Sequence, residues 1–192
     1  MLSTTELAQV MTSLRAHGRT RGLPDKNHVL DKSGDEFDDL FRFVLHGYSL
    51  RPLELKGAID SEQLKRVPGT IQGRRKNHET FASLMEQFPM VKTQREIGES
   101  HWFGFSLILS ENLSDRRSEL VDIFTKYGIA SRPSVAGNFT RNPVMKHLKH
   151  VSLPDLPNSD QVHENGLFIA NHYYGMVEDF SLLESALKEF LK

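Results

Sequence analysis

The order of apolar runs in the second half of the chain constrains its fold more than any other feature. Three short runs have the alternating or apolar character of strands: HWFGFSLIL at 101–109, GIASRP at 128–133 and GLFIAN at 166–171. Helical patterns separate these runs, and a further helical pattern closes the chain at 177–191. Strands interleaved with helices, after a helical first half, predict an α+β fold in which helices cover a small sheet.

The helices are predicted from apolar residues that recur every three or four positions. A helix over 4–16 places four apolar side chains on one face: Leu7, Val10, Met11 and Leu14. Pro52 and Pro68 each suit the first turn of a helix, where the missing N–H costs nothing. The helix after Pro68 carries a predicted buried stripe: Ile71, His78, Phe81, Met85 and Phe88. In the first strand, four residues are predicted to share one face: Phe103, Phe105, Leu107 and Leu109.

Residues 17–46 differ from the rest of the chain, because they are charged and turn-rich and show no period. A loop of this length is usually functional, an interface arm or disordered. We therefore divide the chain into an N-terminal helix with a projecting arm at 1–50 and a small α+β domain at 51–192. Residues 17–50 are expected to project from the body or to exchange with a second copy, because they look too polar to pack.

Composition narrows the classes of function. The net charge is −1, with 24 basic against 25 acidic residues, so no overall field favours nucleic acid or a membrane as a partner. The chain has no cysteine, which excludes disulfides, zinc–thiolate sites and iron–sulfur clusters on its own residues. The N-terminus does not resemble a signal peptide. These features fit a cytoplasmic protein.

Two features that could suggest a metal or a covalent site have ordinary interpretations. His147 and His150 are spaced for one helix face, but no third ligand lies near them in the sequence, so surface histidines are favoured. Lys56 lies on a predicted helix surface, and nothing around it indicates the desolvation that an imine-forming lysine needs. The sequence therefore predicts neither a metal site nor a catalytic residue.

Polar side chains with planar groups gather at the predicted ends of strands and helices. Arg51 and Arg132 each precede a proline, which holds the arginine backbone extended. The others are Asn138, Thr140, Arg141, Asn142, Asn171 and His172. Guanidinium and amide groups suit a bidentate grip on phosphate, carboxylate or sugar hydroxyls. Loop capping explains them equally well, so the residues alone leave both interpretations open.

Five segments together resemble one family: SLRAHGRTRGLP, FRFVLHGYSLRPLELKGAI, EQLKRVPGTIQGRRKN, GIASRPSVAGNFTRNPVMKH and NGLFIANHYYG. The chain resembles the C-terminal part of the DegT/DnrJ/EryC1/StrS sugar-nucleotide aminotransferases, and most closely their GDP-sugar 3-dehydratase branch. These are pyridoxal phosphate (PLP) enzymes. The resemblance implies the small C-terminal domain of the aspartate-aminotransferase fold (fold type I), without the large cofactor domain.

The resemblance also assigns roles to residues. It implies that Ser49 and Arg51 reach across a dimer interface toward the cofactor phosphate or the substrate of the neighbouring subunit. The family usually has asparagine where this chain has Ser49, which offers one donor instead of two. The predicted substrate-binding residues are expected to gather near one cleft: Arg132, Asn138, Arg141 and His172.

Members of the family are about twice as long, by the same resemblance, and their catalytic lysine or histidine comes from the preceding half. We therefore expect this chain to be a C-terminal fragment or subunit of a nucleotide-sugar 3-dehydratase or aminotransferase. The whole enzyme would make deoxysugars for lipopolysaccharide, and this chain is expected to be inactive alone. The resemblance implies glutamate and a nucleotide sugar as ligands. It implies that the chain pairs either with a second copy, as a homodimer, or with a chain that carries the cofactor domain. The alternatives are a noncatalytic nucleotide-sugar-binding or protein-interaction module, or a decayed fragment.

Overall fold

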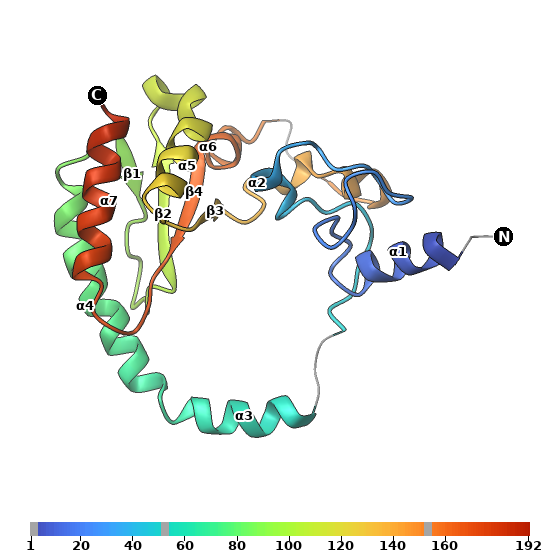
Figure 1. Cartoon of the computed structure of the whole chain (residues 1–192), viewed down its shortest axis with the longest axis horizontal. Helices are drawn as coiled ribbons and strands as arrows, with labels where there is room; N and C mark the ends of the chain where they lie inside the picture. Colours follow the sequence, from blue (N-terminus) through green and yellow to red (C-terminus); the bar gives the residue numbers. More distant parts are fainter. Residues whose placement is uncertain (1–3, 51–53, 152–154) are drawn as a thin grey trace. The chain divides into compact units, whose positions relative to one another are not determined.

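The computed structural model describes residues 4–50, 54–151 and 155–192, and it divides into two compact units (Figure 1). Unit 1 consists of Met1–Leu53 and Val135–His163, and unit 2 of Glu54–Ser134 and Glu164–Lys192. The predicted boundary between residues 50 and 51 stays a prediction, because residues 51–53 lie outside the described ranges. Within those ranges, no helix combines the length and apolar character needed to cross a membrane.

The elements follow the predicted order. The first unit contains α1 (Thr4–Leu14), α2 (Glu36–Asp39) and the 3-10 helices η2 (Phe139–Arg141) and η3 (Pro143–His147); α6 (Pro157–Asn165) runs from unit 1 into unit 2. The second contains α3 (Glu54–Leu64), α4 (Val67–Met85), β1 (Val91–Thr93), β2 (Gly104–Leu109), η1 (Glu111–Arg116), α5 (Arg117–Lys126), β3 (Ser131–Pro133), β4 (Gly166–Ala170) and α7 (Val177–Phe190). The α+β class is confirmed.

Unit 2 is built on one antiparallel sheet with the strand order β1-β2-β4-β3. The three predicted strands all lie in it, so that prediction is confirmed, and β1 is an edge strand that the sequence did not predict. Phe105 pairs with Ile169, and Ile169 pairs with Ser131, so these residues share a face. In the adjacent position of the register, Ser106 of β2 and Arg132 of β3 both pair with Phe168 of β4. These three residues therefore lie on the opposite face of the sheet.

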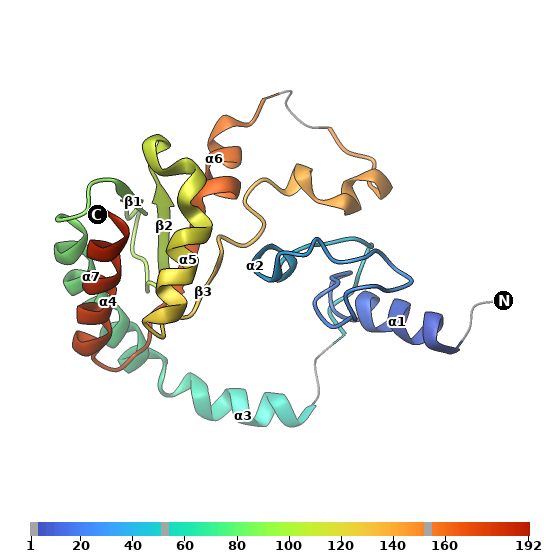
Figure 2. The same cartoon turned by 45° about the horizontal axis from the view of Figure 1, so that its top comes forward.

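Helices cover the first of these faces. Figures 1 and 2 show α4 and α7 side by side against the sheet, and they contact each other. The Phe81 ring of α4 stacks on the Phe105 ring with a centroid distance of 4.0 Å. The predicted buried positions of α7 are confirmed: Phe180, Leu183, Leu187 and Phe190.

Phe103 is the exception to the predicted strand face. Its side chain is 57% exposed, whereas Phe105, Leu107 and Leu109 are buried. The backbone of Trp102 has a φ of 49°, a left-handed conformation that interrupts the extended chain before β2 begins. The alternation of side chains therefore starts at Gly104, and the prediction that Phe103 shares a face with Phe105, Leu107 and Leu109 was wrong.

Residues 17–50 pack within unit 1, contrary to the expectation that they are too polar to do so. The Gly18 carbonyl accepts hydrogen bonds from the N–H groups of Val44 and Leu45, and the Phe43 carbonyl accepts one from Val144. Leu23 and Val44 are buried. Backbone hydrogen bonds therefore hold this segment in place, although its sequence has no hydrophobic periodicity. Exchange of this segment with a second copy stays a prediction.

Two glycines let the chain cross itself in unit 1. A Cβ on Gly47 would lie 1.9 Å from the Gly18 backbone nitrogen, and a Cβ on Gly18 would lie 1.9 Å from the Leu45 carbonyl oxygen. Real Cβ atoms do not approach backbone so closely, so only glycine fits at either position. The crossing fixes residues 47–49 against the end of α1, where the Tyr48 N–H donates to the Leu14 carbonyl and the His17 N–H to the Tyr48 carbonyl.

We predict that Gly18→Ala destabilises the protein far more than Gly34→Ala. Both glycines have positive φ, +76° and +91°, but Gly34 has open space around it. Gly34→Ala should therefore cost only the strain of the left-handed backbone, about 1–2 kcal/mol. Gly18→Ala should cost about 3 kcal/mol or more, because backbone must also move. Urea unfolding of the two variants measures the difference, and equal losses would contradict the crossing.

Candidate functional site

Arg132 lies on β3, opposite Phe168 of β4, on the face of the sheet away from the core. Its guanidinium carbon lies 4.6 Å from the centre of the Phe168 ring and 5.9 Å from that of Phe103. We call these two rings the aromatic shelf; their centroids are 6.1 Å apart. A Cβ on Gly104 would lie 2.1 Å from the Phe168 ring, so this glycine makes room for the ring. Stacking on the shelf holds the arginine in place while its charge is kept.

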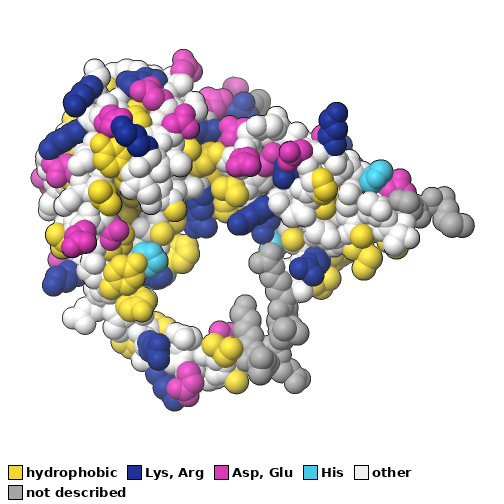
Figure 3. Space-filling view, viewed as in Figure 1, with side chains coloured by type: hydrophobic (Ala, Val, Ile, Leu, Met, Phe, Trp, Pro, Cys, Tyr) yellow, Lys and Arg dark blue, Asp and Glu magenta, His cyan; other side chains and the backbone are white. Residues whose placement is uncertain are grey.

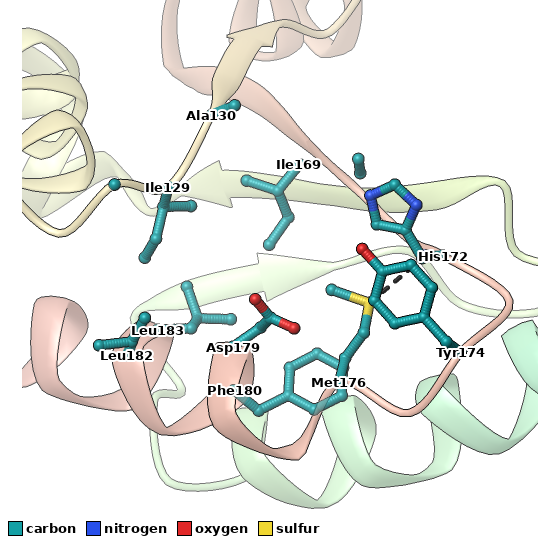
Figure 4. Close-up of a pocket in the computed structure, with 12 residues that line it drawn as sticks. Ile129, Ala130, Ile169, His172, Tyr174, Met176, Asp179, Phe180, Leu182 and Leu183 are labelled. Carbon is teal, nitrogen blue, oxygen red and sulfur yellow. Dashed lines mark hydrogen bonds between the residues drawn. The ribbon is translucent and has the colours of Figure 1, made fainter.

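His172 lies at the mouth of a pocket of about 210 Å³ in unit 2 (Figure 4). Its ring stacks on Tyr174 at a centroid distance of 4.8 Å, and its backbone N–H donates to the Met176 sulfur at 3.3 Å. Ile129 and Ile169 supply apolar lining, and Asp179 adds a carboxylate from the first turn of α7. Tyr173, in the loop before α7, and Val177, the first residue of α7, are exposed. Figure 3 shows that hydrophobic side chains gather at several places on the surface.

The loop that contains Asn138 and Arg141 is ordered by its own side chains. Asn138 is buried, and its Oδ1 accepts from the Thr140 N–H at 3.0 Å and from the Thr140 hydroxyl at 2.6 Å. Its Nδ2 donates to Asp160 at 2.8 Å. The exposed Arg141 reaches the same carboxylate at 3.5 Å. Asn138 is therefore a cap that shapes the loop, and Arg141 is the residue that the loop presents to solvent.

Ser49 lies on the segment that the glycine crossing fixes. It forms an isolated bridge with Ala16 and is exposed, and its neighbours Tyr48 and Leu50 are 66% and 70% exposed. Arg51 lies outside the described residues. The backbone of Ser49 is thus fixed by the bridge to Ala16, and its side chain is exposed between the exposed side chains of Tyr48 and Leu50.

The predicted site residues are divided between the units. Ser49, Asn138 and Arg141 belong to unit 1, whereas Arg132 and His172 belong to unit 2. Their convergence on one cleft stays a prediction. In the part of the chain that the structure describes, no group of three or more histidine or acidic side chains is arranged to hold a metal ion.

Sequence reasoning missed Asn77, a buried residue of α4. Its Nδ2 donates to Asn171 Oδ1 at 3.1 Å and to the carbonyls of His172 and Tyr174 at 2.9 and 2.8 Å. Asn171 in turn donates to the carbonyls of Arg74 at 3.0 Å and Trp102 at 2.8 Å. The signal that could have revealed it is an asparagine four residues before Phe81, inside an apolar helical stripe.

Two further contacts hold the same region. A Cβ on Gly73 would lie 2.0 Å from the Tyr173 carbonyl oxygen, so α4 and the loop after β4 meet backbone to backbone. The His78 ring lies flat on Trp102, with ring centroids 3.6 Å apart. Burial lowers the pKa of His78, and the nearby carboxylates of Glu96 and Glu79 offset only part of that effect.

Comparison with known proteins gives a family and a set of relatives. The model of the DegT/DnrJ/EryC1/StrS aminotransferase family matches residues 1–180. GDP-4-keto-6-deoxy-D-mannose 3-dehydratase of Yersinia pseudotuberculosis is 42% identical over 96% of this chain and 47% of its own length.

Solved structures agree with this match. GDP-4-keto-6-deoxymannose-3-dehydratase with a trapped PLP-glutamate geminal diamine is 41% identical, with a TM-score of 0.67, and the match covers 95% of this chain and 48% of that one. The same enzyme with bound GDP-perosamine gives a TM-score of 0.68 at 41% identity and the same coverage. The fold is thus part of the PLP aminotransferase fold, as predicted. The chain spans about half the length of the curated relatives it matches.

We predict that Asn171→Ala destabilises unit 2 by about 2–4 kcal/mol. The variant leaves the carbonyls of Arg74 and Trp102 without this donor and removes an acceptor from Asn77, and unsatisfied buried groups are costly. Amide hydrogen exchange should rise in residues 171–175. The control is Asn112→Ala at an exposed position of η1, which should change stability little. Equal stability of the two variants would show that the amide network contributes nothing.

We predict that His78 makes the protein less stable in acid. Its pKa is lowered below the ordinary 6.5 in the folded state, so the unfolded chain binds the proton more readily. Stability from this residue is therefore complete above about pH 6.5 and declines as the pH falls through the folded pKa. His78→Phe keeps a ring against Trp102 and should flatten the profile between pH 7 and 5. Urea midpoints measured across that range should show a smaller slope in the variant, and parallel profiles would refute the assignment.

Proposed function

Because the chain belongs to the DegT/DnrJ/EryC1/StrS aminotransferase family, we propose that it forms the small-domain half of a PLP-dependent nucleotide-sugar 3-dehydratase. The observation that carries the proposal is the 42% identity to GDP-4-keto-6-deoxy-D-mannose 3-dehydratase across 96% of this chain. The substrate would then be a GDP-linked 4-keto-6-deoxy sugar, with glutamate as amino donor. Such chemistry belongs to deoxysugar synthesis for lipopolysaccharide in the cytoplasm.

The unit 1 residues fit the phosphate of the cofactor. Ser49 is exposed on a segment held by backbone hydrogen bonds, and a hydroxyl can donate to a phosphate oxygen. Arg51 would add a bidentate guanidinium, because the following proline limits its backbone. PLP, when bound, supplies an electron sink for the carbon chemistry of the sugar. This chain's residues would hold and orient its phosphate.

The exposed side chains beside Ser49 support binding across an interface. Tyr48 and Leu50 expose most of their apolar surface on either side of the serine. Large exposed apolar side chains next to a polar group favour contact with another chain. We propose that this segment completes the cofactor pocket of a second copy, or of a chain that carries the cofactor domain.

The substrate would be held by residues that the structure presents on fixed supports. Arg132 is held on the aromatic shelf and offers a planar fork to an anionic oxygen. Arg141 reaches solvent from the loop that Asn138 caps. His172, stacked on Tyr174, can donate to or accept from a sugar hydroxyl at its pocket.

The proposal predicts activity by complementation. This chain is mixed with a polypeptide carrying the half of the Yersinia pseudotuberculosis dehydratase that the match leaves uncovered, together with PLP, glutamate and GDP-4-keto-6-deoxymannose. We expect 3-deoxy product from the mixture or from a fusion of the two, and none from this chain alone. Arg51→Ala should reduce turnover at least tenfold, because a charge-assisted contact to phosphate is lost.

Three results would decide against the proposal or a part of it. Lys26→Ala removes an exposed charge from another loop of unit 1 and serves as the control, so an equal loss from both variants would refute the role of Arg51. No turnover from either the mixture or the fusion would refute the dehydratase function and favour a noncatalytic binding module. An amino sugar in place of the 3-deoxy product would identify an aminotransferase.

A further inference from the structure

The pocket beside His172 has an interior to which the proposed function assigns no ligand. Ile169 of β4 lines the pocket and shares a face of the sheet with Phe105, the face that α4 and α7 cover. Arg132 lies on the opposite face, where it pairs with Phe168. The sheet therefore separates the interior of the pocket from the arginine that would meet the nucleotide sugar.

The pocket forms where the edge strand β3 leaves its neighbour β4. The two strands pair as far as Ser131 and Ile169, and the next residues, Ala130 and Ala170, are not part of the ladder. Both of these alanines line the pocket, and the first turns of α7 border it on the helical side (Figure 4). The walls are mainly apolar: Ile129, Ile169, Met176, Phe180, Leu182 and Leu183.

Two polar groups, the Asp179 carboxylate and the Tyr174 hydroxyl, border this apolar cavity. Figure 4 shows the carboxylate between Met176 and Leu183, and the Tyr174 ring with its hydroxyl end toward the same space. Among the described residues, neither the carboxylate nor the hydroxyl has a hydrogen-bond or ion-pair partner. The pocket thus contains two acceptors, one of them charged, that the described part of the chain does not use.

The charges around the pocket favour a cation. None of the described residues that line it is a lysine or an arginine, and Glu178 adds a second exposed carboxylate beside Asp179. Lys126, in the last turn of α5, is paired with Glu189 at 2.7 Å. The two carboxylates outweigh the positive end of the α7 dipole, which is equivalent to roughly half a charge. Apolar walls lower the effective dielectric constant and so strengthen the attraction of Asp179 for a cation.

The size and the acceptors of the pocket select among cations. A metal ion such as Ca²⁺ needs several oxygen ligands, and the pocket offers one carboxylate. A primary ammonium has three donors, which suit the carboxylate, the hydroxyl and a water molecule. The pocket volume of about 210 Å³ is below the ~300–1,000 Å³ that is typical of sites for drug-sized ligands. The arrangement therefore fits a small organic amine with a short apolar chain.

We propose that this pocket binds a small primary alkylammonium ion. Its ammonium group donates to the Asp179 carboxylate and to the Tyr174 hydroxyl, and its alkyl chain lies along the apolar wall that includes Ile129 and Ile169. This inference goes beyond the proposed function and does not depend on it, because the interior of the pocket and the Arg132 face lie on opposite sides of the sheet.

Binding is measured by two-dimensional amide NMR on the isotopically labelled full chain, with n-hexylammonium, n-hexanol and hexanoate as separate ligands. The three ligands have similar apolar chains and differ in the charge of the polar end. We expect hexylammonium to shift the signals of residues 129–130 and 172–183 with a Kd of about 1 mM or tighter. Hexanol should bind at least about fivefold more weakly, because it lacks the charge-assisted contact, and hexanoate should not bind.

Variants separate the two polar groups. Asp179→Asn keeps the shape of the side chain, removes its charge and should weaken hexylammonium binding about tenfold or more. Tyr174→Phe removes only the hydroxyl and should weaken binding about two- to tenfold. The matched control is Glu178→Gln, which removes the same charge from the adjacent position of α7, outside the pocket lining. Its effect should stay within about twofold, because solvent and salt screen an exposed charge.

Any of four results would overturn the site. These are no saturable shift with hexylammonium up to about 10 mM, binding of hexanol as tight as that of hexylammonium, equal losses in Asp179→Asn and Glu178→Gln, or shifts confined to residues outside the pocket. Circular dichroism confirms that each variant is folded. None of these measurements involves PLP or a cofactor-domain chain, so complementation can fail while the pocket binds the amine, and the reverse.

Discussion

The buried amide pair of Asn77 and Asn171 is the interaction on which the candidate site of unit 2 depends. Asn171 follows β4 directly and donates to carbonyls of α4 and of the turn before β2. Asn77 donates to Asn171 and to two carbonyls of the loop that leads to α7. Three segments that are distant in sequence, namely α4, the turn before β2 and the loop after β4, are therefore fastened at one point. Because the hydrogen bonds are buried, loss of one partner leaves the others unsatisfied, and the arrangement is specified strongly.

The same amide pair fixes two features that a ligand would meet. On one side it fixes the backbone of Trp102, whose left-handed φ directs Phe103 toward Phe168 and Arg132. On the other it fixes the His172 carbonyl, and with it the pocket in which the histidine stacks on Tyr174. A polar network in the core thus sets the position of side chains at the surface. Hydrogen bonds are directional, so they fix these positions more precisely than hydrophobic packing alone would.

Unit 1 is organised by a different principle. Its described residues bury few large apolar side chains, chiefly Leu23, Val44 and Val144, and the chain is ordered by backbone hydrogen bonds and by capping asparagines. Such an arrangement depends on close backbone approach, which explains why Gly18 and Gly47 have no space for a side chain. Ordering polar loops costs conformational entropy, and unit 1 buries little apolar surface of its own to offset that cost. An interface that covers Tyr48 and Leu50 would bury additional apolar surface.

The sequence predicts those features of the structure that depend on residues close together in the chain. The strands β2, β3 and β4 and the buried face of α7 follow from local apolar patterns, and the structure confirms them, whereas β1 was not predicted. Phe103 was misplaced because alternation assumes an extended backbone, and the left-handed Trp102 breaks it. Asn77 was missed because its partners lie 94 or more residues away, a separation that no local pattern encodes. The family resemblance supplied the roles of Ser49 and Arg51, which periodicity and composition do not.

The charge balance of the chain sets how an anionic substrate would be recognised. With a net charge of −1, the molecule has no overall positive field, and at physiological salt, attraction between exposed charges fades within about 8 Å. Recognition must then come from groups that are already in place when the ligand arrives. Arginine suits this task, because stacking on an aromatic ring holds its plane without consuming its charge. As the proposed substrate-binding residue, Arg132 would select ligands by the geometry of their oxygens, and total charge alone would not be enough to bind them.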